Sequence, residues 1–293
     1  MTSYSIDSIK YKPLNKIKSK LFYSKNILQM IAQNKKKSFS KFQRNSSIVE
    51  KDYNFNSWLN ILKEKKWLKY DNLLDFVLDS KNTLNDEQLS YIENKICKIT
   101  RSEYAKFRKE ILNFYITENI DDSDTIVELG CGWGLNLWTI LANNPQKKLE
   151  GYELSENGLN ACTEINDHFN CDVSFGNIDL KKNSTFPILK NKSVFTFHVL
   201  EQLKYDTSIV IENIIKSKPK MVLHFEPVPE LYGNSDHEKL VKYFIQYMDY
   251  QDNLLDTLKN FEKEGRITIV ESKRLNFAAN PFYETCLIKW IPI

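Results

Sequence analysis

The sequence of 293 residues predicts an α/β fold, in which a doubly wound, mostly parallel sheet follows a helical region. Three observations support this prediction. After residue 120, short apolar runs typical of buried strands alternate with segments of helical spacing. The first of these runs ends in a glycine-rich turn at 130–134, where a helix begins. Residues 57–120 contain no glycine and no proline and carry apolar side chains at helical spacing.

The composition is that of a globular chain without a membrane span. Hydrophobic residues make up 42% of the sequence, and no run reaches the ~18 apolar residues that indicate a membrane helix. The N-terminus lacks the charged-then-apolar pattern of a signal peptide. Five cysteines without CxxC spacing favour free thiols in a reducing cytoplasm over disulfides or structural zinc; they are Cys97, Cys131, Cys162, Cys171 and Cys286.

Residues 1–56 form a basic arm that we expect to be partly ordered. The segment before Glu50 has a net charge of about +10, whereas the whole chain has +3. Its cations are Lys10, Lys12, Lys16, Lys18, Lys20, Lys25, Lys35, Lys36, Lys37, Lys41 and Arg44. One interpretation is weak contact with an anionic membrane surface, an acidic carrier or nucleic acid, without sequence-specific nucleic-acid recognition. The simpler one is a solvated lead-in whose apolar residues pack on the main domain.

The pattern of residues 57–120 predicts a series of packed helices. Apolar side chains recur at helical spacing over 58–68, 73–78, 84–99 and 105–115. The third of these segments contains Leu89, Ile92 and Ile96, and Asn85 or Asp86 is a candidate cap for it. We therefore expect a helical cap region ahead of the sheet.

The turn after the first predicted strand has the features of a cofactor site. Gly130, Gly132 and Gly134 let the backbone turn tightly and approach a ligand closely, and the following helix aims free N–H groups at that ligand. Glu153, at the end of the second predicted strand, lies where a ribose-binding carboxylate is expected. The dinucleotide fingerprint G-x-G-x-x-G does not fit, because its third small position falls on Leu135.

The peptide Glu128-Leu-Gly-Cys-Gly-Trp-Gly134 resembles the E/D-x-G-x-G-x-G signature of class I S-adenosylmethionine-dependent methyltransferases. The resemblance implies a seven-stranded Rossmann-like domain over 121–293, S-adenosylmethionine as cofactor, and a lid role for 57–120. Within that region Tyr104 and Arg108 are candidates for closing the site, and each could instead be a surface or core residue. The cofactor-binding residues that it implies are Glu128, Gly130, Cys131, Gly132, Gly134, Glu153, Leu154, Asn177, Ile178, Asp179 and His198. For the adenine amino group Asp179 is the first choice and Asn177 the second, because the family's G-D-x-x-D-L pattern is one residue shorter here.

The fourth and fifth predicted strands, over 193–198 and 221–226, bring a second group of polar residues together. Parallel neighbours end at one edge of a sheet, so we expect His198, Glu201, His224 and Glu226 to surround the methyl acceptor as catalytic residues. Either histidine could take a proton from a hydroxyl acceptor, and each could instead be a hydrogen-bonded structural residue. Similar enzymes often have V-L-E-H here; Gln202 replaces that histidine, which argues against a metal site.

The C-terminal part predicts a loop at 227–233, helical segments over 240–261, and a strand pair at 266–271 and 285–291. Asn280-Pro-Phe-Tyr283 resembles the N-P-P-Y/F motif of amino-methylating nucleic-acid enzymes, but it follows the wrong strand and lacks the second proline. We interpret it as a turn, from which Tyr283 could line the pocket.

Together these features predict a methyltransferase that acts on an oxygen, or a nitrogen, of a small molecule such as a sugar or secondary metabolite. A nucleic-acid or protein methyltransferase that uses the basic arm is one alternative. A scaffold that binds the cofactor without catalysis is another. The glycine turn and the two histidines favour the first interpretation over the scaffold.

Overall fold

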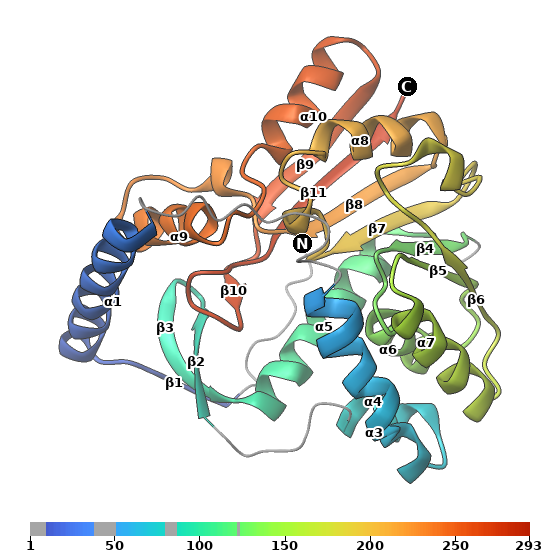
Figure 1. Ribbon diagram of the computed structural model, residues 1–293, viewed down its shortest axis with the longest axis horizontal. Coiled ribbons are helices and arrows are strands. Elements are labelled where there is room, and N and C mark those ends of the chain that lie inside the picture. The colour runs from blue at the N-terminus through green and yellow to red at the C-terminus, as the bar shows by residue number, and fades with distance from the viewer. Residues whose placement is uncertain (1–9, 38–50, 80–86, 122–123) are drawn as a thin grey trace.

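The computed structural model describes residues 10–37, 51–79, 87–121 and 124–293. Its main feature is a seven-stranded sheet in the order β6-β5-β4-β7-β8-β11-β9 (Figure 1). The strands are β4 (Ile126–Leu129), β5 (Leu149–Glu153), β6 (Val173–Asn177), β7 (Ser193–Phe197), β8 (Met221–Glu226), β9 (Ile267–Arg274) and β11 (Cys286–Pro292). Strands β4 to β8 pair in parallel, whereas β11 is antiparallel to both of its neighbours. The predicted doubly wound, mostly parallel α/β fold is therefore confirmed.

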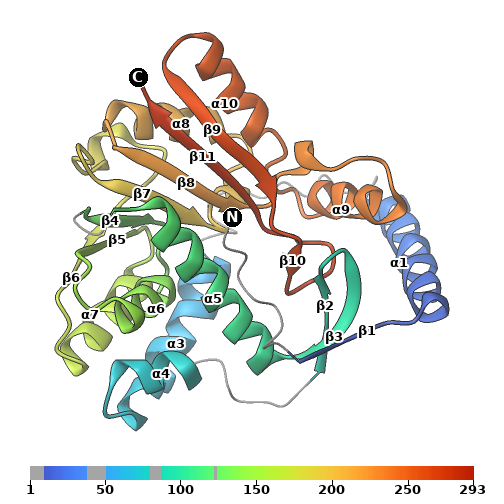
Figure 2. The same cartoon turned by 180° about the vertical axis from the view of Figure 1, so that it is seen from behind.

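Helices cover both faces of this sheet (Figures 1 and 2). One face packs against α5 (Arg101–Asn119), α6 (Leu135–Asn143) and α7 (Glu156–His168), and the other against α8 (Thr207–Lys216) and α10 (Leu254–Lys263). Successive side chains of a strand point to opposite faces. Accordingly Ile126 joins the first hydrophobic cluster, and Val127 joins the second.

The prediction of a helix over 84–99 is wrong. The chain forms a hairpin there, made of β2 (Glu87–Ile92) and β3 (Lys95–Thr100), in a small antiparallel sheet of order β1-β3-β2-β10. Glu93 and Asn94 connect the strands with φ of 48° and 62°, the left-handed pair that a two-residue hairpin turn requires. The caps predicted at Asn85 and Asp86 lie outside the described residues.

This small sheet joins distant parts of the chain. Its first strand is β1 (Tyr11–Pro13), from the basic arm, and its last is β10 (Phe277–Ala278), from the connection between β9 and β11. The sheet lies beside the large one in both views (Figures 1 and 2). The N-terminal segments are thus fixed to the C-terminal end of the chain.

The other predicted helices between 57 and 120 are present. They are α3 (Leu59–Glu64), with the 3₁₀ turn η3 (Lys66–Lys69), α4 (Leu73–Asp79), and α5. Helices α4 and α5 pack against α6, while α3 and the π-helical turn η2 (Lys51–Trp58) pack against α7. The segment before the sheet therefore lies next to the two helices that follow β4 and β5.

Part of the basic arm is helical. Helix α1 (Lys16–Lys37) contacts α9 (Asp236–Tyr247) at the edge of the molecule. Lys41 and Arg44 of the predicted arm lie outside the described residues. None of the described helices is both long enough and apolar enough to cross a bilayer.

Candidate functional site

The turn after β4 has the tight geometry that its glycines predict. Gly130 and Gly132 have φ of +75° and +58°, in the left-handed region that favours glycine. The Gly130 and Cys131 amides both donate to the carbonyl of Tyr152, at 2.7 and 3.1 Å. A Cβ on Gly130 would lie 2.3 Å from Cγ2 of Val199, and one on Gly132 would lie 2.8 Å from the Trp58 ring. Side chains other than hydrogen are excluded at both positions.

A cavity of about 1410 Å³ opens above this turn, at the carboxyl ends of the parallel strands. Most of the predicted site residues line it: Glu128, Gly130, Cys131, Gly132, Glu153, Leu154, Asn177, Ile178, Asp179, His198 and Glu201. Gly134 does not line it. That residue has φ of +83° and begins α6, and a Cβ there would lie 2.8 Å from the Trp138 indole nitrogen. Its glycine is required by the turn and by packing.

Glu128 is a buried carboxyl group in the cavity lining. Its side chain is fully buried, and Oε1 accepts a hydrogen bond from Asn136 Nδ2 at 2.5 Å. The amide oxygen of Asn136 accepts in turn from Nη2 of Arg108 at 2.6 Å. Glu128 Oε2 is buried without a hydrogen-bond partner among the described residues. Burial raises the pKa of Glu128 to about 8.

A buried carboxylate oxygen without a partner is costly, so its neighbourhood is informative. Arg108 lines the same cavity, stacks its guanidinium 4.1 Å over the Phe197 ring, and pairs with no carboxylate in the described part of the chain. Burial lowers the pKa of Arg108. Glu128 and Arg108 therefore place an acidic and a basic group on one wall of the cavity, suited to a ligand that carries both charges.

Glu153 connects the ends of β4 and β5. Its Oε2 accepts from the Gly132 amide at 2.8 Å, and its Oε1 accepts from the Ser155 amide at 2.9 Å. Burial raises the pKa of this carboxyl group, whereas these backbone donors oppose the rise. Because the side chain still lines the cavity, the carboxylate is fixed in place beside the turn and can accept further hydrogen bonds from a ligand.

The two candidates for the adenine contact differ in their present partners. The side-chain Nδ2 of Asn177 donates to the backbone carbonyls of Glu153 and Leu154, at 3.2 and 3.0 Å. Asp179 accepts from the Lys181 amide at 3.1 Å and forms an ion pair with Lys182 at 3.2 Å. Both line the cavity, on either side of the buried Ile178.

His198 also lines the cavity, immediately after β7. Its φ is +55°, an uncommon conformation for a residue with a side chain. Nδ1 lies 3.1 Å from Oε2 of Glu201, and Nε2 lies 2.8 Å from the hydroxyl of Thr285. With Nδ1 protonated, the ring donates to Glu201 and accepts from Thr285. The strained backbone and the two contacts hold the imidazole at the cavity wall.

The predicted role of His224 at the acceptor is contradicted by its position. The residue is fully buried inside β8 and does not line the cavity. Its Nδ1 lies 3.0 Å from the Thr196 hydroxyl, and its Nε2 accepts from the Trp290 indole at 2.9 Å. Burial lowers its pKa to about 3, so it is neutral and structural. The reason is register: His224 lies level with Thr196, two residues before His198.

The structure also contradicts the predicted role of Glu226 at the acceptor. It is fully buried, lies outside the cavity lining, and accepts from the Val199 amide at 3.1 Å. Burial, and then the nearby Glu201, raise its pKa. Its carboxyl group stabilises the turn that follows β7 and so supports His198 indirectly.

The segment before α3 covers the glycine turn. Trp58 belongs to 57–120, for which the resemblance implies a lid, whereas the sequence did not indicate Asn54. Oδ1 of Asn54 accepts from the Ser155 hydroxyl at 2.7 Å and from the Asn157 amide at 3.1 Å. The Trp58 ring rests on Gly132. Asn54 and Trp58 both line the cavity, so this segment acts as a cover over the ends of β4 and β5.

Aromatic rings line the cavity around His198. The Tyr283 ring lies 4.7 Å from the His198 ring and 5.4 Å from that of Tyr250, and Phe197 and Tyr104 line the cavity nearby. Tyr283 thus lines the cavity, and Tyr283 and Asn280 lie in a turn, as the sequence predicts. Among the described residues, no group of three His, Cys, Asp or Glu side chains is placed to hold a metal ion.

Comparison with solved structures identifies the fold. The chain is similar to magnesium protoporphyrin IX methyltransferase from Synechocystis PCC 6803 with bound SAH, at 11% identity and a TM-score of 0.53 over 84% of this chain and 99% of that one. The same enzyme with bound SAM is 12% identical, with a TM-score of 0.51 over 86% of this chain and 98% of that one. The [4+2]-cyclase SpnF is 12% identical, with a TM-score of 0.51 over 77% of this chain and 94% of that one. No protein-family model matches, and no curated protein sequence matches. The chain has the fold of class I S-adenosylmethionine-dependent methyltransferases.

Proposed function

We propose that the protein is an S-adenosylmethionine-dependent methyltransferase that acts on a small molecule. The observation that carries this proposal is the buried Glu128 oxygen without a partner, beside the glycine turn and Glu153. When bound, S-adenosylmethionine supplies an activated methyl group. Its amino-acid end carries both an ammonium and a carboxylate, which fit Glu128 Oε2 and the Arg108 guanidinium respectively.

The remaining cofactor contacts follow from the same wall. Glu153 accepts hydrogen bonds from the ribose hydroxyls, and Leu154 and Ile178 supply apolar contacts to the adenine. Asp179 or Asn177 accepts from the adenine amino group. The fold supports this assignment, since the structures of similar fold include one with bound SAM and one with bound SAH.

The acceptor occupies the part of the cavity beside His198. The total volume exceeds the roughly 300–1,000 Å³ of a typical ligand pocket, which leaves room for an acceptor beside the cofactor. Glu201 holds Nδ1 of His198, so Nε2 is the nitrogen that takes the proton of a hydroxyl acceptor once the Thr285 hydroxyl turns away. The cover and the aromatic wall exclude water and align the acceptor. We favour oxygen as the nucleophile, on a sugar or secondary metabolite.

A second candidate is a cofactor-binding protein without methyl transfer. Both ring nitrogens of His198 already have partners, and one protein of similar fold is named as a cyclase. For either candidate we place the protein in the cytoplasm, because its five cysteines are free thiols.

Turnover distinguishes the two candidates. The protein is incubated with methyl-labelled S-adenosylmethionine and panels of sugar nucleotides and phenolic or other hydroxylated metabolites, and products are analysed by mass spectrometry. The proposal predicts a labelled methyl ether and stoichiometric S-adenosylhomocysteine. Cofactor binding without transfer to any acceptor would favour the second candidate, and absence of cofactor binding would exclude both.

A further inference from the structure

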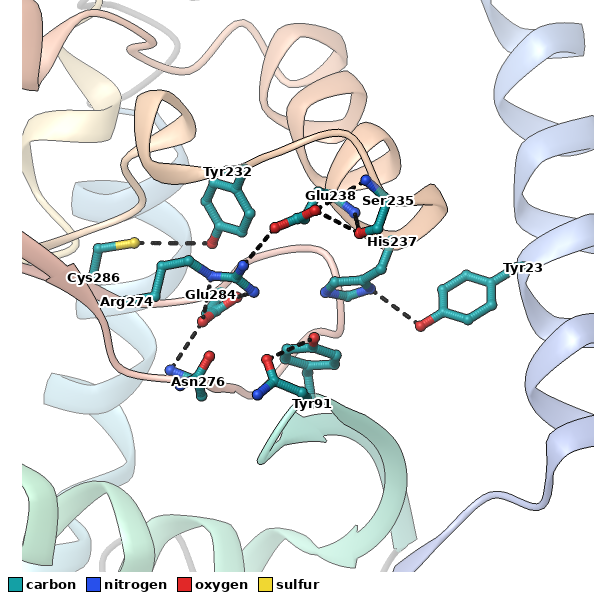
Figure 3. Close-up of polar contacts among 11 residues, drawn as sticks. Tyr23, Tyr91, Tyr232, Ser235, His237, Glu238, Arg274, Asn276, Glu284 and Cys286 are labelled. Atoms are coloured by element: carbon teal, nitrogen blue, oxygen red, sulfur yellow. Dashed lines mark hydrogen bonds and ion pairs between the residues drawn. The ribbon is translucent and has the colours of Figure 1, made fainter. Parts of the chain in front are cut away.

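Helix α1 is held against the body of the protein by one of its faces. Tyr23 reaches inward, and its hydroxyl lies 3.3 Å from Nδ1 of the buried His237 of α9 (Figure 3). The Phe22 ring stacks on Phe282 at 5.5 Å, and Ile27 packs in the same cluster. This face is thus fixed to α9 and to the loop between β10 and β11.

The residues that anchor this face make further contacts with both sheets. The His237 ring stacks 3.9 Å from the Tyr91 ring of β2. Nearby, Arg274 of β9 forms ion pairs with Glu238 of α9 and with the buried Glu284, at 2.8 and 2.9 Å (Figure 3). The orientation of α1 about its own axis is therefore set by a histidine that contacts β2 of the small sheet and lies beside an ion pair to β9 of the large sheet.

The opposite face of α1 exposes a stripe of large apolar side chains. Ile17, Leu21 and Leu28 are 71%, 65% and 68% exposed. At 3.6 residues per turn, spacings of four and seven residues bring all three onto one narrow stripe, turned away from Phe22 and Tyr23. No described residue covers this stripe, which is unusual for three large side chains on one helix.

Lysines flank this stripe on both sides. By the same helical geometry, Lys18 and Lys25 lie on one side and Lys16 and Lys20 on the other. All four are exposed, and none forms an ion pair with a described carboxylate. The helix contains no acidic residue, and three more lysines occur at its C-terminal end. Long lysine side chains can lie along an apolar surface while their charges reach outward.

We propose that the outer face of α1 docks on an anionic lipid membrane, with Ile17, Leu21 and Leu28 inserted at the headgroup boundary and the flanking lysines on lipid phosphates. An apolar stripe between two rows of cations, on a helix lying at the protein edge, is the pattern of helices that lie in the membrane interface. Anionic headgroups attract such lysines at the surface of the cytoplasmic leaflet. This inference does not depend on the proposed enzymatic activity.

Two other occupants fit the face less well. A second copy of the chain, related by a two-fold axis, would set two lysine-rich helices with no acidic residue against each other, and like charges repel. A nucleic acid would neutralise the lysines but would leave the apolar stripe in contact with water or phosphate. The membrane satisfies both the cations and the apolar side chains.

Vesicle sedimentation of the full chain tests the proposal. Vesicles of phosphatidylcholine alone are compared with vesicles of phosphatidylcholine and phosphatidylserine, at low and high salt. We expect binding only to the anionic vesicles and weaker binding at high salt. The stripe variant I17S/L21S/L28S should bind roughly tenfold less or weaker still, because it loses apolar insertion and keeps every charge.

A matched control removes three exposed apolar side chains elsewhere, as I188S/V270S/I293S. This control should bind like the wild type, and circular dichroism should show both variants folded. Equal vesicle binding by the stripe variant and the wild type would overturn the proposal, as would wild-type binding to RNA without binding to vesicles. Self-association that the stripe substitutions abolish, without vesicle binding, would assign the face to a second copy instead.

Discussion

The predicted cofactor residues and the predicted acceptor residues were inferred from different kinds of sequence signal, and the structure places the two groups differently. Glu128 and Glu153 line the cavity as expected. His198 and Glu201 line it as well, but His224 and Glu226 are buried in the sheet. The cofactor residues were inferred from the 128–134 motif and from an acid at the end of the next strand. The acceptor residues depend on how far each of two neighbouring strands extends, which a pattern of residues alone does not specify.

The two histidines make this difference concrete. His198 follows the last residue of β7, where φ of +55° turns it onto the cavity wall. His224 lies two residues before the end of β8, level with Thr196, and bonds to Trp290 instead. Similar side chains, two residues apart in register, therefore have different environments. A histidine at a strand end is a candidate for catalysis only when the chain has already left the sheet.

The largest expected effect separates these histidines by turnover. His198→Ala should lower turnover on a hydroxyl acceptor by roughly 10²–10⁴-fold, because it removes the group that takes the proton. His224→Gln should keep near wild-type turnover per folded molecule, since it lies outside the cavity. Steady-state kinetics on both variants, corrected for the folded fraction, would check this. Equal turnover of His198→Ala and wild type would assign catalysis to positioning alone.

A smaller effect is expected at Glu128. Burial holds its pKa at about 8, so the group is mainly protonated at pH 7, whereas an ammonium on Oε2 would stabilise the charged form. Cofactor binding at pH 7 should therefore release close to one proton from this residue, measured by calorimetry in buffers of different ionisation enthalpy. Glu128→Gln should abolish that release and weaken binding by ~1.5–3 kcal/mol.

Arg108→Met offers a control for the Glu128 result. It should weaken cofactor binding without abolishing proton release, because the carboxyl group at Glu128 remains. Unchanged proton release in Glu128→Gln would show that another group loses the proton and would remove the carboxylate from the ammonium contact.

The smallest effect concerns stability in acid. The pKa of His224 falls from 6.5 in the unfolded chain to about 3 in the fold. Below pH 6.5 the unfolded chain therefore takes up a proton that the folded protein does not, and stability is lost as the pH falls toward 3. Between pH 6.5 and 5 this loss is about 2 kcal/mol.

Urea unfolding at pH 7 and pH 5 measures this contribution. His224→Gln should lower stability at pH 7, because the Trp290 contact is disturbed, but it should flatten the decline toward pH 5 by ~2 kcal/mol. His237, whose pKa burial lowers to about 4, remains in the variant and keeps part of the decline. An unchanged slope in the variant would show that His224 is accessible to protons in the fold.

Sequence reasoning was most successful where local patterns determine the structure. The strands and helices around the large sheet follow from apolar periodicity, and the turn follows from Gly130, Gly132 and Gly134, all of which have positive φ. The β2–β3 hairpin was missed because its Glu93–Asn94 turn lacks a glycine, while Leu89, Ile92 and Ile96 fit a helical period. Periodicity over a short segment does not distinguish the two when the turn signal is weak.

The tertiary contacts of the site could not be predicted from spacing. The hydrogen-bond chain from Arg108 through Asn136 to Glu128 joins α5, α6 and β4, and no local pattern relates these positions. Asn54 reaches the start of α7 from far away in the sequence. Thr285 was assigned to a strand, and only the packing of its hydroxyl on His198 shows a second role. Such contacts depend on the packing of whole elements.

One titration tests the central claim most directly. The claim is that the glycine-turn end of the cavity binds S-adenosylmethionine through Glu153 and its neighbours. In isothermal titration the wild type should bind S-adenosylhomocysteine and should not bind NAD, and Glu153→Ala should bind S-adenosylhomocysteine more weakly by ~1.5–3 kcal/mol. Undiminished binding by Glu153→Ala would contradict the ribose assignment, and a wild type that binds NAD but not S-adenosylhomocysteine would contradict the claim itself.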